Sequence, residues 1–168
     1  ALGLVISRLG MNEQGSQQNR KKQQKRPYGQ ADASFQAAGG QAGLQALVEA
    51  FYDLMASEPR CERLVKMHPP DLAVSIDKLA RFLCGWLGGP RRYNEKYGTI
   101  RLPFAHAHLS ITDQDKEDWL WCMEKALAEQ PFERDFKAYL MVQFRKPAER
   151  IVQVCRSNLA STDDRTPT

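Results

Sequence analysis

Three histidines are the side chains of this sequence best suited to chemistry near neutral pH. His106 and His108 lie two residues apart, and His68 stands directly before a pair of prolines. A neutral imidazole nitrogen can bind a transition metal, move a proton or take a simple hydrogen bond. A lone histidine beside an apolar face most often does only the last of these. The histidines by themselves therefore leave several functions open.

Four cysteines could act as metal ligands, but their spacing argues against it. No two of the cysteines are spaced as a C-x-x-C pair, so the sequence predicts no zinc knuckle. The four are Cys61, Cys84, Cys122 and Cys155. The simplest interpretation is that they are reduced side chains of a cytoplasmic protein. A zinc site made of the three histidines and one cysteine is a weaker alternative.

Apolar residues recur at helical spacing along most of the chain and predict an all-α fold. The clearest stripe joins Leu44, Leu47 and Phe51 to Tyr52, so we expect the Tyr52 hydroxyl to point toward the interior. No alternating strand pattern persists in the sequence. The predicted helices are 34–38, 41–57, 59–66, 71–87, 113–129 and 132–157, and the segment 91–105 is predicted to be an irregular loop.

Length and composition predict one globular domain of 34–157, with a disordered basic extension over 1–33 and a tail over 158–168. The 168 residues are 42% hydrophobic and 26% charged, which is ordinary for a soluble protein. No apolar run approaches the roughly 18 residues that a membrane span needs. The opening residues lack a signal-peptide pattern, so we expect a cytoplasmic protein.

The net charge of +4 lies entirely in the first 33 residues, which hold six basic and two acidic side chains. The remainder is formally neutral, so we expect no basic nucleic-acid surface on the domain. A solvated extension is the simplest interpretation of residues 1–33. An arm for nucleic acid or anionic lipid is the alternative.

A series of motifs in fixed order resembles the group II truncated haemoglobins over about residues 34–130. The motifs are Phe51-Tyr52, Met67-His68-Pro69, Phe82-Leu83-x-Gly85-Trp86-Leu87-Gly88-Gly89-Pro90, Tyr97-Gly98, His106-x-x-x-x-Ile111 and Trp119-Leu120-x-Cys122-Met123. The resemblance implies a two-over-two helical sandwich around haem b. It also implies that the chain binds dioxygen and other diatomic ligands such as nitric oxide and carbon monoxide.

The resemblance also implies roles for individual residues. His106 matches the proximal iron ligand, with His108 as its competitor. The distal ligand-binding positions match Tyr52, His68, Ser75, Leu79 and Trp119. The positions expected to contact the haem are Lys78, Phe82, Trp86, Arg92, Tyr93, Arg101, His106, Ile111 and Met123.

One segment departs from the family pattern. Members commonly carry an arginine-rich stretch directly before the proximal histidine, whereas this chain has Pro103-Phe104-Ala105. Lys78, Arg92, Tyr93 and Arg101 are the candidates for binding the haem propionates, because carboxylates attract cations and phenols. The departure counts against this assignment and predicts a more apolar surface face of the haem.

Bound dioxygen draws negative charge from ferrous iron, and hydrogen-bond donors in a dry pocket stabilise that charge. With Tyr52, His68 and Trp119 as donors, we expect ligand retention and a role in detoxifying reactive oxygen or nitrogen species. Dioxygenase or peroxidase chemistry would need an external reductase, because no flavin or dinucleotide motif occurs. The alternatives are oxygen delivery or sensing, and a haem-free helical interaction module with a basic tail. We expect a monomer or a dimer.

Overall fold

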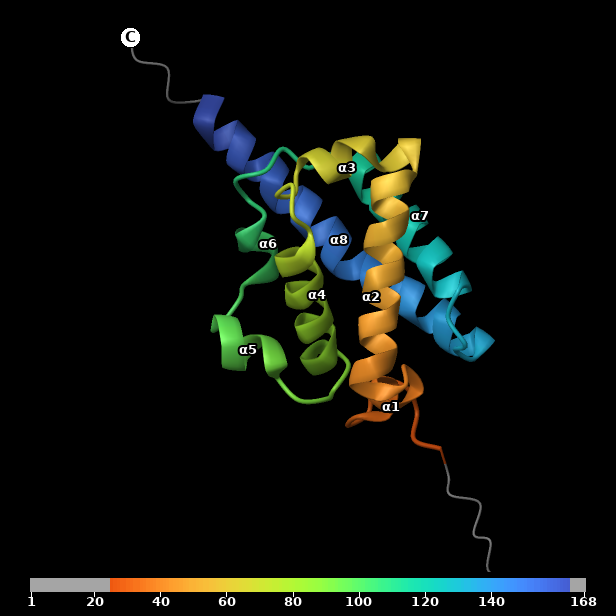
Figure 1. Ribbon diagram of the computed structural model, residues 1–168. Helices are drawn as coiled ribbons and strands as arrows, with labels where there is room; N and C mark the ends of the chain where they lie inside the picture. Colours follow the sequence, from red (N-terminus) through yellow and green to blue (C-terminus); the bar gives the residue numbers. More distant parts are fainter. Residues whose placement is uncertain (1–24, 164–168) are drawn as a thin grey trace, which may run out of the picture.

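The computed structural model describes residues 25–163, and every regular element in that range is a helix (Figure 1). This confirms the predicted all-α class. The elements are α1 (Ala33–Ala37), α2 (Gly40–Ser57), the 3-10 helix η1 (Pro59–Cys61), α3 (Glu62–Lys66), α4 (Ala73–Trp86), α5 (Arg92–Tyr97), α6 (Leu102–Ala105), α7 (Asp113–Ala128) and α8 (Arg134–Asp163). None of these helices is both long and apolar enough to cross a membrane.

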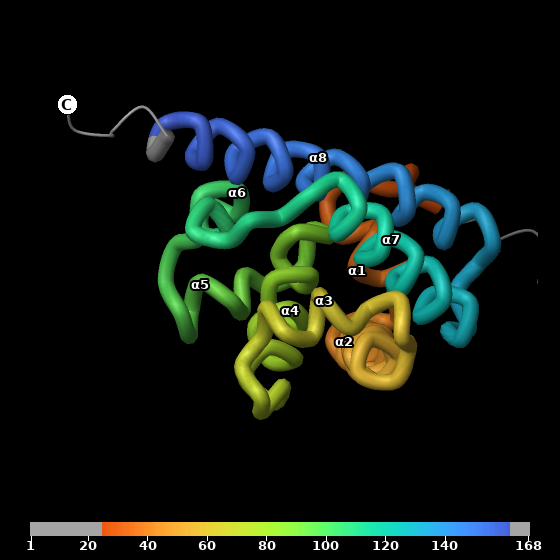
Figure 2. The backbone as a smooth tube through the Cα atoms, turned by 90° about the horizontal axis from the view of Figure 1, so that it is seen from above, coloured from red at the N-terminus to blue at the C-terminus, as the bar shows by residue number. Residues whose placement is uncertain are grey.

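Two helix pairs form the body of the protein. Helix α2 packs on α4, α7 packs on α8, and α2 also contacts α7. Viewed from above, α7 and α8 form one layer, and α2 and α4 lie beneath it (Figure 2). The stripe predicted on α2 is buried throughout and forms the centre of the core. Helix α6 lies against α8 at one end of this sandwich.

The predicted irregular loop over 91–105 is wrong, because this segment contains the short helices α5 and α6. Hydrophobic periodicity in the sequence does not indicate these two helices, because neither has a buried side chain. Pro103 occupies the first turn of α6, where its missing N–H costs no helical hydrogen bond. Helix α8 also continues past residue 157, the predicted end of the last helix, and passes through Pro147.

The folded part begins before residue 34. The Tyr28 ring lies 5.0 Å from the Phe136 ring between centroids, and its hydroxyl donates to the Asp135 carboxylate at 2.9 Å. Tyr28 of the predicted extension therefore packs on α8, and Ala31 packs on the turn after α4. Residues 1–24, which hold most of its basic side chains, lie outside the described residues.

The turn after α4 needs glycine. Gly88 has φ +89°, which L side chains rarely adopt, and a Cβ there would collide with the Ala31 carbonyl. A Cβ on Gly89 would lie 2.5 Å from the Phe35 ring. The chain thus packs α1 directly on this turn, which fixes the end of α4 beside the core.

Helix α7 begins at a capping box. The Thr112 hydroxyl accepts from the Asp115 N–H at 3.1 Å, and the Thr112 N–H donates to the Asp115 carboxylate at 2.9 Å. Arg63 of α3 donates to the same carboxylate at 2.8 Å. Asp115 is only 1% exposed, so this buried carboxylate joins α3 to the start of α7.

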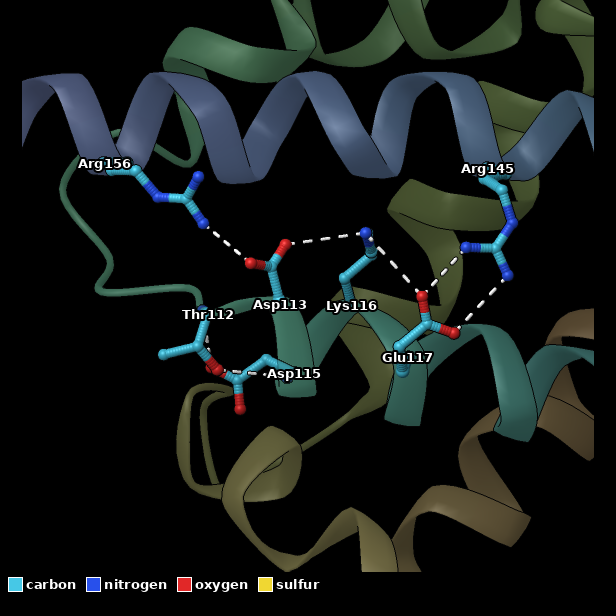
Figure 3. Close-up of polar contacts among 7 residues, drawn as sticks. All are labelled: Thr112, Asp113, Asp115, Lys116, Glu117, Arg145 and Arg156. Atoms are coloured by element: carbon cyan, nitrogen blue, oxygen red, sulfur yellow. Dashed lines mark hydrogen bonds and ion pairs between the residues drawn. The ribbon is translucent and has the colours of Figure 1, made fainter.

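A row of ion pairs joins α7 to α8 on the protein surface (Figure 3). Asp113 pairs with Arg156 at 2.7 Å and with Lys116 at 3.5 Å. Glu117 pairs with Lys116 at 3.6 Å and with Arg145 at 2.9 Å. Only 12% of the Lys116 side chain is exposed, so its aliphatic part packs between the two helices while its ammonium reaches the surface charges.

Candidate functional site

A cavity of about 330 Å³ lies between the two helix pairs. That volume falls within the range of small-molecule and cofactor pockets. Eight of the predicted site residues line it: Tyr52, His68, Leu79, Phe82, Trp86, His106, Ile111 and Trp119. Residues that come from α2, α4, α7 and the segment after α6 thus meet at one place, although they are far apart in the sequence.

His106 is held with one ring nitrogen satisfied and the other available. It follows directly after α6, and its Nδ1 lies 2.7 Å from the Leu102 carbonyl oxygen. A carbonyl can only accept, so Nδ1 carries the proton and Nε2 carries a lone pair. This arrangement is the one that a metal-binding histidine requires, because the second hydrogen bond sets both the tautomer and the ring orientation.

Helix α8 holds the segment that carries His106. The Cys155 thiol donates to the His106 carbonyl at 3.2 Å, and the Asn158 amide donates to the Ala107 carbonyl at 2.8 Å. Both contacts come from the part of α8 beyond Pro147. The long last helix therefore positions the histidine, which sequence periodicity alone did not indicate.

Tyr52 and Trp119 supply hydrogen-bond donors to the cavity. The Tyr52 side chain is 6% exposed, and its burial raises the pKa of the phenol to about 12. The hydroxyl is therefore protonated at neutral pH. Within residues 25–163, neither the Tyr52 hydroxyl nor the Trp119 N–H has a protein hydrogen-bond partner. Every fully enclosed side-chain nitrogen or oxygen in that range does have a partner, so these two groups are not fully enclosed. Both groups are thus accessible in the cavity that their side chains line.

His68 has the same hydrogen-bond arrangement as His106. Its Nδ1 lies 2.7 Å from the Leu64 carbonyl oxygen, and its ring packs edge-on against Tyr52 with centroids 5.5 Å apart. The neutral imidazole therefore carries its proton on Nδ1, and Nε2 is an acceptor. This differs from the sequence-based expectation that His68 donates a hydrogen bond into the pocket.

Six predicted residues do not line the cavity. Ser75 is half-buried on α4, and Met123 is fully buried in the core. The other four lie on α4, on α5 and directly before α6. Lys78 and Arg101 are exposed, whereas Arg92 and Tyr93 are half-buried. The Arg92 guanidinium contacts the Gln41 amide instead. Their contacts with haem, including those with the propionates, stay predictions.

Several lining residues were not predicted. Phe144, Pro147 and Ile151 form a wall on α8, and Lys116 adds its aliphatic stem from α7. Phe144 and Ile151 lie on the apolar stripe of the last helix, which was the available signal. His108 also lines the cavity, so it is still the competitor of His106.

The residues present fit haem. The cavity is lined mainly by aromatic and aliphatic side chains, it contains an imidazole with a free Nε2, and it holds two unpaired donors from α2 and α7. The zinc alternative fails, because no three histidine, cysteine, aspartate or glutamate side chains of the described region are grouped to hold a metal ion. An iron held by a porphyrin needs only one protein ligand.

Comparisons with known proteins agree with this geometry. The sequence model described as bacterial-like globin matches residues 33–150. The group 2 truncated hemoglobin YjbI of Bacillus subtilis is 31% identical over 121 residues, which cover 72% of this chain and 89% of that protein.

Solved structures share the fold. The cold-adapted truncated hemoglobin of Pseudoalteromonas haloplanktis TAC125 superimposes with a TM-score of 0.68 at 30% identity, covering 71% of this chain and 96% of its own. The group II 2-on-2 hemoglobin of Agrobacterium tumefaciens superimposes with a TM-score of 0.67 at 31% identity, covering 70% of this chain and 92% of its own. The chain therefore belongs to the bacterial-like globins, as a group II truncated haemoglobin whose cofactor is haem b.

Proposed function

We propose that this globin binds nitric oxide and carbon monoxide as well as dioxygen, and that it retains its ligand for the detoxification of reactive oxygen or nitrogen species. The observation that carries the proposal is one cavity with two unpaired donors, Tyr52 and Trp119, and a histidine with a free Nε2, His106. When bound, haem supplies the iron that takes the diatomic ligand. The haem-free interaction module is set aside because the family binds haem.

His106 is the proposed proximal ligand. Its Nδ1–H bond to the Leu102 carbonyl sets the tautomer and holds the ring plane. Cys155 and Asn158 restrain the same segment from α8. These contacts direct Nε2 of His106 toward the cavity that its side chain lines.

Tyr52 and Trp119 are the proposed donors to the ligand. A hydrogen bond to a partly charged acceptor in a dry pocket contributes roughly 1–3 kcal/mol. Two such bonds slow ligand escape, which suits redox chemistry better than rapid delivery. A related truncated haemoglobin from Bacillus subtilis is oxygen-avid, which supports retention here. A catalytic cycle takes its electrons from an external donor, and we place the protein in the cytoplasm.

The first test of the site is the absorbance spectrum of His106→Ala beside wild type and His108→Ala, in the ferric state and in the ferrous state with carbon monoxide. We expect the haem band of His106→Ala to be lost or shifted and that of His108→Ala to match wild type. The reverse pattern would assign the iron to His108. A wild-type protein that takes up no added haem would end the proposal.

A second test addresses retention. We expect Tyr52→Phe and Trp119→Phe each to raise the oxygen dissociation rate roughly tenfold, because about 1.4 kcal/mol of stabilisation corresponds to that factor. Stopped-flow displacement of oxygen by carbon monoxide measures the rate, with Tyr139→Phe on α8 as the matched control. Rapid release in wild type that Tyr52→Phe leaves unchanged would refute ligand retention by these donors.

A further inference from the structure

A chain of aromatic rings leads from the cavity to the protein surface. Phe82 and Trp86 both line the cavity and stack with centroids 6.3 Å apart. The Phe82 ring is 6.3 Å from the Tyr93 ring, and Tyr93 is 5.1 Å from Tyr97. Both tyrosines lie on α5, which packs beside α4 (Figure 1). Electron transfer falls steeply with distance, so oxidisable rings such as Trp86 and Tyr93 divide one long transfer into short ones, and Phe82 lies between them as a bridge.

Tyr97, at the outer end of this row, has a proton acceptor in place. Its hydroxyl donates to the Asp77 carboxylate at 2.6 Å, which is the short distance of a charge-assisted hydrogen bond. Lys96 donates to the same carboxylate at 2.8 Å and Arg81 at 2.9 Å. Hydrogen bonds from Lys96 and then from Tyr97 hold the pKa of Asp77 well below its usual range. The carboxylate is therefore ionised, and as a weak base it takes the phenolic proton only when Tyr97 loses an electron, because an oxidised phenol is a far stronger acid.

The surface around Tyr97 is cationic. The Lys78 and Lys96 ammonium groups each lie 5.3 Å from the centre of the Tyr97 ring. Residues 77–101 hold six lysine and arginine side chains against two carboxylates. Arg91 and Arg101 are exposed on either side of α5. These charges attract small anions to the partly exposed tyrosines.

We propose that Tyr97 is the electron-uptake site of a peroxidase activity, at which small anionic one-electron donors reduce the oxidised haem through Tyr93 and Phe82. The proposal rests on haem binding and names the reductant class for the detoxification proposed above. Ascorbate and phenolic carboxylates belong to that class.

In the proposed reaction hydrogen peroxide takes two electrons and two protons and gives two waters. Each of the two donor molecules loses one electron to the protein and releases one proton to the solvent, which supplies the two protons consumed. Tyr97 supplies one electron at a time through the rings, and its phenolic proton moves along the hydrogen bond to Asp77. An external donor then returns an electron to the tyrosyl radical, and the proton returns from Asp77. Two donor molecules are oxidised for each peroxide reduced.

The test uses the haem protein mixed with hydrogen peroxide, freeze-quenched and examined by electron paramagnetic resonance. We expect a tyrosyl radical in wild type that Tyr97→Phe largely removes. Tyr139→Phe is the matched control, because Tyr139 packs on Phe136 away from the cavity lining. We expect Asp77→Asn to lower the radical yield as well, because it removes the proton acceptor while Tyr97 remains.

Turnover with ascorbate is the second readout. We expect Tyr97→Phe to lower ascorbate oxidation severalfold while the reaction of the haem with peroxide, followed by absorbance without a donor, stays at the wild-type rate. Added salt should slow the oxidation of anionic ascorbate more than the oxidation of uncharged hydroquinone. Equal radical yield and equal ascorbate turnover in Tyr97→Phe would overturn the inference. A haem that does not react with peroxide would also overturn the inference, but the proposed oxygen binding would still stand. A protein that takes up no haem would instead overturn the proposed function.

Discussion

At the scale of single residues, the protonation of Tyr52 decides what the distal side of the cavity can do. Burial raises the pKa of its phenol to about 12, so without a metal bound to it the side chain is a neutral hydrogen-bond donor at physiological pH. His68, whose Nδ1–H is directed to the Leu64 carbonyl, complements it as an acceptor. Two neighbouring polar side chains thus take opposite hydrogen-bonding roles because of their separate surroundings.

The raised pKa of Tyr52 predicts a loss of stability in alkali. Between pH 10 and about 12 the unfolded phenol ionises while the folded phenol keeps its proton, so the free energy of unfolding falls as pH rises through this window. The contribution is about 2–3 kcal/mol, at 1.36 kcal/mol per pKa unit. Urea unfolding of wild type and Tyr52→Phe at several pH values measures it.

We expect wild type to lose stability relative to Tyr52→Phe as pH rises above 10. Tyr139→Phe keeps Tyr52 and should therefore follow the wild-type pH dependence. A difference that stays constant up to pH 12 would mean that the Tyr52 phenol is as accessible in the folded protein as in the unfolded chain.

At the scale of elements, the start of α7 depends on one buried carboxylate. Asp115 completes the capping box with Thr112 and accepts from Arg63 of α3. Helix α7 also carries Trp119 and the stem of Lys116 into the cavity. The position of these cavity residues therefore depends on a polar contact outside the apolar core.

We predict that Asp115→Asn lowers the free energy of unfolding by about 2 kcal/mol, because it removes the charge of a buried carboxylate that accepts from the exposed Arg63 and weakens the N-terminal cap. The matched control is Asp113→Asn, two residues away in the same helical turn. The Asp113 side chain is 65% exposed and pairs with Arg156, and we expect that change to cost less than about 1 kcal/mol. Urea titration compares the two variants, and equal losses would contradict this role for Asp115.

At the scale of the whole molecule, stability is uneven. The buried core lies on α2, α4, α7 and α8, whereas α5 and α6 contribute no buried side chain. These two short helices nevertheless carry the tyrosines of the proposed electron route and hold His106. The functional side of the protein is thus built on its least buried elements.

We predict that removal of haem accelerates amide hydrogen exchange most strongly between residues 92 and 111. In the proposed site haem would cover the inner face of this segment, whereas the core on α2 and α8 is packed without it. Hydrogen-exchange mass spectrometry of the haem-bound and haem-free proteins measures the pattern. A uniform increase over all helices would mean that the core itself depends on the cofactor.

The sequence alone determined the long helices, the inward face of Tyr52 and the ordered motifs that lead to the globin family. These features are local, because side chains three and four residues apart share one face of a helix whatever surrounds it. The glycines of the turn after α4 were readable for a related reason, since their backbone conformation and close contacts exclude other residues.

Only the tertiary structure decided which side chains meet. The cavity wall on α8, the contacts from Cys155 and Asn158 to the His106 segment, and the packing of Tyr28 on Phe136 join residues that are distant in the sequence. The structure also decided the His68 tautomer, because a single carbonyl in reach of Nδ1 fixes which nitrogen carries the proton. Helix crossing, which periodicity does not encode, brings these groups together.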